Sequence, residues 1–289
     1  MSSSRVKALL WLLPLLILTA GFDPPDDAVC RIVDDFPLPA DIAIMSGSEV
    51  KHYRTGDSTH EPHYGGSLFK PFIAVRLLKT GEISPGQIYE CRMALEGQEG
   101  LKRCWLERGH GSLDLPHAIA YSCNRWFAQA LQDVDLADLD NWMRWAREVN
   151  DPPIGSPGMV ERLVGIDPVY HTSCEWGVQV FAMLIETEKL AKEEIKKPVL
   201  EGLRLAVAEG TASRLSREFP ALLLAEPYGK TGSAPGCDDR PEGGWLYLSF
   251  LDKEKVRIHL VIHVDNGDGA DAVDLATKLL PRWFPGREK

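Results

Sequence analysis

The spacing of apolar residues predicts a helical middle section of the chain. Residues 67–78 place apolar side chains on one wide helical face, and Gly81 is placed to end that helix. Residues 113–135 carry a second helical pattern, which is interrupted around Ser122, and residues 178–191 carry a third.

Strand patterns dominate the last quarter of the chain, from about Tyr228. Residues 245–251 and 256–264 are separated by a short charged stretch, as in a hairpin. An alternating run at residues 42–45 predicts an early strand, and helical spacing returns at residues 272–280. Together these elements predict an α+β fold, in which helices pack on an antiparallel sheet and a helical subdomain accompanies it.

The first residues have the charge order of a secretory signal peptide. Arg5 and Lys7 precede a mostly apolar run, residues 8–20, which contains one proline. A membrane-spanning helix needs about 20 apolar residues, so cleavage is favoured, with an uncleaved short anchor as the alternative. We expect a leader at residues 1–22 and one compact domain at residues 23–289. The mature protein would then be exported, to the periplasm or the outer face of the cytoplasmic membrane.

The charge and the cysteines of the chain limit which binding partners, disulfides and metal sites we expect. The net charge of −10 is spread along the chain, which favours solubility and disfavours nucleic acid as a partner. Six cysteines in an exported chain permit disulfides, and only Cys91 and Cys104 are close in sequence, so we predict that pair. No paired C-x-x-C spacing occurs, so neither a metal site nor a cofactor is expected.

Three short motifs carry the candidate chemistry. They are Ser67-Leu68-Phe69-Lys70, Ser122-Cys123-Asn124, and Lys230-Thr231-Gly232 followed by Ser233. Other S-x-x-K copies begin at Ser4 and Ser48, and a second K-T-G begins at Lys79. A nucleophilic serine is useful where it opens a helix, because a lysine one turn on then lies beside its hydroxyl and backbone N–H groups face a developing oxyanion. Only Ser67 meets this condition.

Around these motifs the sequence resembles the transpeptidase domain of penicillin-binding proteins, particularly the class B type. The likeness runs from about Tyr64 to Gly269. Its stretches, in the family's order, are GGSLFKPFIAVRLLKTGEISPGQIYEC, CWLERGHGSLDLPHAIAYSCNRWF, LRLAVAEGTAS, and YGKTGSA followed by GWLYLSF. The chain shows no separate pedestal or glycosyltransferase domain, so a bifunctional synthase is not expected.

The resemblance implies a serine acyl-enzyme that acts on D-alanyl-D-alanine stem peptides of peptidoglycan and is acylated by β-lactam antibiotics. Ser67 would attack the carbonyl, Lys70 would take its proton, and Ser122 would relay that proton to the departing amine. The expected substrate-binding residues are Asn124, Lys230, Thr231, Gly232 and Ser233. Backbone N–H groups of Ser67 and Ser233 would form the oxyanion hole. Whether an amine or water takes the acyl group stays open.

Two alternatives share this fold. The first is a non-enzymatic β-lactam sensor or peptidoglycan-binding module, which could keep all three motifs. The second is a serine β-lactamase, whose class A form resembles E-x-x-x-N, whereas Glu161 is followed four residues later by Gly165. The class D form carries Y-G-N where this chain has Y-G-K, beginning at Tyr228. The transpeptidase interpretation is therefore preferred.

Overall fold

The structure is a computed structural model that describes residues 26–55, 62–92, 104–146, 163, 171–235 and 241–284. The predicted leader, residues 1–22, lies outside these described residues, as do Ser4 and Glu161. Within the described part of the chain, none of the helices has both the length and the apolar character needed to cross a bilayer.

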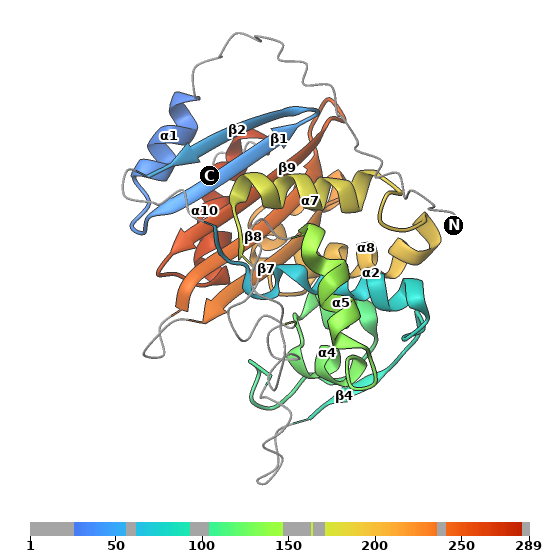
Figure 1. The fold of residues 1–289 in the computed structure, drawn as a ribbon. Helices are drawn as coiled ribbons and strands as arrows, with labels where there is room; N and C mark the ends of the chain where they lie inside the picture. The colour runs from blue at the N-terminus through green and yellow to red at the C-terminus, as the bar shows by residue number, and fades with distance from the viewer. Residues whose placement is uncertain are drawn as a thin grey trace, which may run out of the picture.

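A five-stranded antiparallel sheet lies at the centre of the fold, with the order β2-β1-β9-β8-β7 (Figure 1). Its strands are β1 (Ala40–Ser46), β2 (Glu49–Arg54), β7 (Tyr228–Pro235), β8 (Pro241–Leu251) and β9 (Arg257–Asp265). The predicted early strand falls within β1, and the predicted hairpin is β8 and β9. Ala40 lies opposite Val264, so strands from the two ends of the sequence are neighbours.

Helices cover both faces of the sheet and form a subdomain beside it. In Figure 1, α7 crosses the front of the sheet and α10 lies behind it. The helices are α1 (Asp27–Asp34), α2 (Lys70–Thr80), α3 (Leu115–Ala120), α4 (Asn124–Ala130), α5 (Leu136–Met143), α7 (Cys174–Glu186), α8 (Glu193–Ala208), α9 (Ser213–Glu218) and α10 (Gly269–Leu279). The short 3-10 helices are η1 (Gly66–Phe69), η2 (Arg144–Ala146), η3 (Pro220–Ala225) and η4 (Leu280–Arg282). Two small ladders join β3 (His63–Tyr64) to β6 (His171–Thr172) and β4 (Tyr89–Cys91) to β5 (Gly111–Leu113).

The alternating side chains of β9 face two apolar cores. Every second residue from Ile258 to Val264 points to the core shared with α1, α9 and α10, as the strand pattern predicts. Val261 points the other way, into the core shared with α2 and α7. Fully burying such a side chain contributes about 1.5–3 kcal/mol, so the two cores fix which face of the strand turns each way.

Aromatic contacts tie α2 to the sheet. Phe181 of α7 stacks on Tyr247 of β8, with ring centroids 4.0 Å apart. The Phe181 ring also meets Phe72 of α2 edge-on, at a centroid distance of 5.0 Å. This stack holds the first turns of α2 in a defined place relative to the sheet.

The third predicted helix differs from the observed one. The pattern at residues 178–191 is part of α7, which begins at Cys174 and ends at Glu186, and α8 follows after a short break. The end is fixed by the buried Lys196 of α8, whose Nζ donates to the carbonyls of Leu184 at 3.1 Å and Thr187 at 2.9 Å. Such a contact between distant segments satisfies the carbonyls at a helix end, and local periodicity does not contain it.

Candidate active site

Ser67 lies in η1, one turn before Lys70, and Gly66 brings this turn against β7. Gly66 has a φ of 54°, and a Cβ atom there would lie 2.4 Å from the Ser233 carbonyl oxygen. Only glycine meets both conditions without strain. Trp245 of β8 fixes the approach to the turn, because its Nε1 donates to the Tyr64 carbonyl at 2.7 Å. The helix after Ser67 has the predicted start and stop, since Pro71 lies in its first turn and Gly81 ends it with a φ of 77°.

The Lys70 ammonium group is the centre of the hydrogen-bond network. Its Nζ donates to Ser67 Oγ at 3.1 Å, to Asn124 Oδ1 at 2.5 Å and to the Ser122 carbonyl at 3.0 Å. The side chain is fully buried, and the loss of water around the charged form lowers the pKa of Lys70 from 10.5 to about 8. A neutral amine that touches a serine hydroxyl is able to accept its proton.

Ser122 joins two buried lysines. Lys230 Nζ donates to Ser122 Oγ at 2.9 Å, and Lys70 Nζ lies 3.4 Å from the same oxygen. Burial lowers the pKa of Lys230 well below its ordinary value, and the charge of Lys70 adds to that effect. Ser122 lies in the break between α3 and α4, and its φ of 52° is rare for a residue with a side chain. The strained break places one hydroxyl between two amines.

The remaining predicted residues belong to β7, which is an edge strand of the sheet in the described part of the chain. Thr231 Oγ1 donates to Thr211 Oγ1 at 2.7 Å. Gly232 lies so close to η1 that a Cβ atom there would be 2.6 Å from the Gly65 carbonyl oxygen. Ser233 is exposed, and its Oγ accepts from the backbone N–H of Gly269 at 3.0 Å. The structure thus brings the sequence-predicted site residues together around Ser67 and the adjoining edge of β7.

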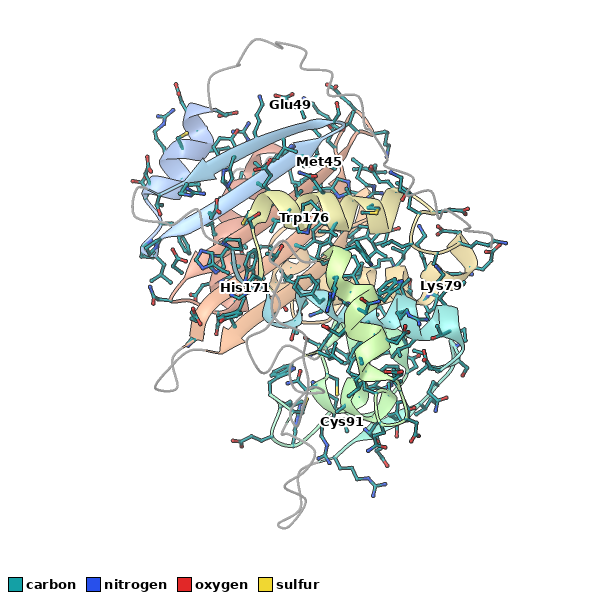
Figure 2. The ribbon with its side chains drawn as sticks, viewed as in Figure 1. Met45, Glu49, Lys79, Cys91, His171 and Trp176 are labelled. Carbon is teal, nitrogen blue, oxygen red and sulfur yellow. The ribbon has the colours of Figure 1, made fainter. Side chains whose placement is uncertain are left out.

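The other motif copies in the described residues lie in different surroundings. Ser48 is exposed in the turn between β1 and β2, and Lys51 pairs with Glu49 at 3.4 Å. Lys79 lies in the last turn of α2, where its Nζ donates to the Leu190 carbonyl at 3.2 Å. Figure 2 shows Lys79 at the end of α2 and Glu49 near the far end of the sheet.

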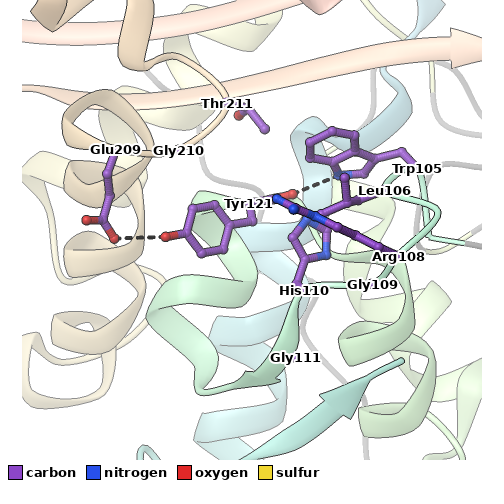
Figure 3. Close-up of a pocket in the computed structure, with 10 residues that line it drawn as sticks. All are labelled: Trp105, Leu106, Arg108, Gly109, His110, Gly111, Tyr121, Glu209, Gly210 and Thr211. Carbon is purple, nitrogen blue, oxygen red and sulfur yellow. Dashed lines mark hydrogen bonds between the residues drawn. The ribbon is translucent and has the colours of Figure 1, made fainter. Parts of the chain in front are cut away.

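A pocket with a volume of about 630 Å³ adjoins this site, and sequence analysis did not identify it. Figure 3 shows the residues that line it, which include Trp105, Arg108, Tyr121, Glu209 and Thr211. Tyr121 donates through its hydroxyl to Glu209 Oε1 at 3.1 Å, and Trp105 Nε1 donates to the Tyr121 carbonyl at 2.9 Å. The pocket borders the site through Thr211, which contacts Thr231, and through Tyr121, which precedes Ser122. Thr211 falls inside the resembling stretch LRLAVAEGTAS, the one sequence signal that marks it.

The predicted disulfide between Cys91 and Cys104 is wrong for this structure, because both are buried free thiols. The imidazole of His110 lies between them, with Nδ1 3.6 Å from Cys91 Sγ and 3.3 Å from Cys104 Sγ. Cys123 is also buried and free, as a small core residue is expected to be. The Cys104 thiol and burial both raise the pKa of Cys123, which makes Cys123 a poor nucleophile.

Comparisons with known proteins agree with this fold. Residues 44–161 match the family model of the penicillin-binding protein transpeptidase domain. A solved peptidoglycan synthase complex contains a similar chain, with a TM-score of 0.73 and 18% identity over 91% of this chain and 61% of that one. The D,D-transpeptidase domain of a peptidoglycan glycosyltransferase from Eggerthella lenta gives a TM-score of 0.69 and 13% identity over 89% of this chain and 80% of that one. PBP2 from Helicobacter pylori, in a complex with MreC, gives a TM-score of 0.70 and 14% identity over 90% of this chain and 62% of that one.

This chain therefore spans about six-tenths of the length of the first of these relatives. Among curated proteins, none matches the sequence. Identities this low show a shared fold, so the predicted α+β fold with a helical subdomain is confirmed.

Proposed function

We propose that this chain, whose fold is that of a penicillin-binding protein transpeptidase domain, is a D,D-transpeptidase that works through a serine acyl-enzyme on peptidoglycan stem peptides. The observation that carries the proposal is the contact of Lys70 Nζ with Ser67 Oγ inside a buried site. Burial keeps part of Lys70 neutral, which is what a base for serine requires.

The proposed reaction follows the hydrogen bonds of the site. Ser67 Oγ attacks the carbonyl carbon of the D-alanyl-D-alanine bond while its proton passes to Lys70 Nζ. Ser122 Oγ, which touches both lysines, then carries a proton to the nitrogen of the departing D-alanine as the carbon–nitrogen bond breaks. The resulting ester on Ser67 passes its acyl group to the amine of a second stem peptide, or to water.

The edge of β7 that carries the exposed Ser233 is the proposed binding surface for the substrate. Lys230, Thr231 and Ser233 would hold its terminal carboxylate, and Asn124 would bind a backbone amide. The pocket beside Thr211 is open next to this edge and would receive a further part of the stem peptide. Such a substrate is found outside the cytoplasm, so we also propose that the protein acts there. If the N-terminal leader is not cleaved, it would attach the protein to the membrane.

We expect the purified protein to release D-alanine from a stem peptide that ends in D-alanyl-D-alanine. Release should stop after prior treatment with penicillin, because both ligands require Ser67. An enzyme-coupled assay for free D-alanine measures this. A peptide that ends in L-alanine is the matched control. Penicillin binding without any D-alanine release would favour the non-enzymatic sensor instead.

We expect the rate of acylation by penicillin to rise with pH and to level off above about pH 8. Lys70 must be neutral to accept the Ser67 proton, and below its pKa of about 8 the neutral fraction falls about tenfold per pH unit. Timed attachment of a fluorescent penicillin across this range measures the profile. A rate that falls as pH rises over this range would contradict the assignment of neutral Lys70 as the base.

A further inference from the structure

Three thiols and one imidazole converge in the helical subdomain beside the proposed site. The four residues are Cys91, Cys104, His110 and Cys123, and their ligand atoms all lie within 4.8 Å of one another. Cys91 ends β4, in the part of the molecule away from the sheet (Figure 2), and His110 lies at the wall of the pocket (Figure 3). None of the four has a role in the proposed acyl transfer.

The distances between these atoms are compatible with a tetrahedron around a small metal ion. Zinc binds thiolate sulfur at about 2.3 Å and imidazole nitrogen at about 2.0 Å, which gives edges of about 3.5–3.8 Å between tetrahedral ligands. Cys104 Sγ lies 3.9 Å from Cys123 Sγ. The His110 Nδ1 distances are 3.6 Å to Cys91 and 3.3 Å to Cys104. A disulfide needs about 2.05 Å between sulfur atoms, and all three cysteines are free in this structure.

The sulfur of Cys123 accepts a hydrogen bond from the backbone. The donor to Cys123 Sγ is the N–H of Trp126, at 3.5 Å. A backbone donor aimed at a ligand sulfur is a common outer contact of metal-bound cysteine.

The surrounding chain holds the ligands in place before any ion binds. Gly109 has a φ of 75°, and a Cβ atom there would lie 2.1 Å from the Cys91 carbonyl oxygen, so the loop can fold onto β4 only with glycine. The His110 ring stacks on Tyr121 at a centroid distance of 5.7 Å and meets Trp105 at 5.2 Å. The His110 ring is therefore held between Tyr121 and Trp105, and the loop that carries it is held against β4.

We propose that Cys91, Cys104, His110 and Cys123 form a closed zinc site that fastens the 104–111 loop and β4 to the turn between α3 and α4. Three soft sulfur ligands with one imidazole favour zinc, and four protein ligands leave no position for substrate. Cys123 stands between Ser122 and Asn124, so the ion would act as a positioning element for the turn that carries both. The absence of C-x-x-C pairs had argued against a metal, but here the ligands come from separate segments.

Zinc content of the full-length protein tests the site directly. The protein is purified without chelators, dialysed against a slight excess of Zn²⁺ and then against buffer, and its metal is measured by mass spectrometry. We expect about one zinc ion per chain. Cys104→Ser and His110→Ala should lose that ion, while Cys30→Ser, which changes a free thiol of α1 in the other core, should keep it.

Cobalt substitution identifies the ligands even where a variant is unstable. Co²⁺ bound to the wild-type protein should show tetrahedral d–d bands and sulfur charge-transfer absorption. Cys104→Asp retains a zinc ligand, so it should keep the metal and lose about one-third of the charge-transfer intensity. Wild-type protein that holds no zinc after dialysis, or that yields a Cys91–Cys104 disulfide on peptide mapping, would overturn the proposal. These readouts do not depend on peptidoglycan chemistry, so the site and the proposed activity can fail separately.

Discussion

Ser67→Ala is expected to abolish covalent attachment of penicillin. A strained lactam mimics the D-alanyl-D-alanine bond, and it is opened by the hydroxyl that Lys70 can deprotonate. The side chain of Ser67 is partly exposed and small, so its loss should leave the fold intact. Intact mass measures attachment, and peptide mapping of the wild-type adduct locates it.

The matched control is Ser48→Ala, because Ser48 begins another S-x-x-K copy but lies in an exposed turn. Its labelling should equal that of the wild type. Labelling that survives Ser67→Ala and maps to Ser122, the other hydroxyl beside Lys70, would move the nucleophile to that residue.

The same adduct, followed after free drug is removed, separates a transpeptidase from a β-lactamase. We expect it to persist for many minutes, because hydrolysis needs a water with its own base and the sequence lacks the class A glutamate context. Rapid loss of the adduct with release of hydrolysed penicillin would favour the β-lactamase alternative.

Lys70→Ala is expected to slow acylation by about two to four powers of ten, as loss of a general base does. The first, non-covalent binding of penicillin should change far less. Stopped-flow kinetics at increasing drug concentration separate the two steps. Lys70→Met serves as the variant of similar volume, because it removes the amine without opening a cavity in the buried site.

Lys79→Ala is the surface control for this experiment, since Lys79 belongs to the second K-T-G and lies on the same helix. Its acylation rate should equal that of the wild type. If both Lys70 variants acylate at the wild-type rate, Lys70 is not the base, and the network around Ser122 and Lys230 would have to supply another.

Local patterns were sufficient for the elements that depend on local spacing. The hairpin of β8 and β9 and the helix that ends at Gly81 are visible in apolar periodicity and turn residues. The sheet order is not visible, because β1 pairs with β9 across most of the chain. The boundary between α7 and α8 was missed for the same reason, since it depends on where the buried Lys196 reaches.

The residues of the candidate site that belong to sequence motifs could be predicted, and those outside the motifs could not. Ser67, Lys70 and the Lys230 motif were recognised from residue type, order and context, whereas the contact of Thr211 with Thr231 exists only in three dimensions. The cysteines show the limit most clearly. The short sequence separation suggested a disulfide between Cys91 and Cys104. In the structure, both thiols instead lie close to Nδ1 of His110.

The sheet order also constrains how the protein is made. β1 leaves the ribosome early, but in the sheet it lies between β2 and β9, and β9 is translated more than 200 residues later. Until then β1 and β2 form at most a hairpin with an open edge, which is marginally stable and prone to mispairing. Pairing over such a sequence distance is slow, so the growing chain needs protection for most of its synthesis. Because β9 joins β1 to β8, a chain that stops at Leu251 would lose the strand that connects the two halves of its sheet.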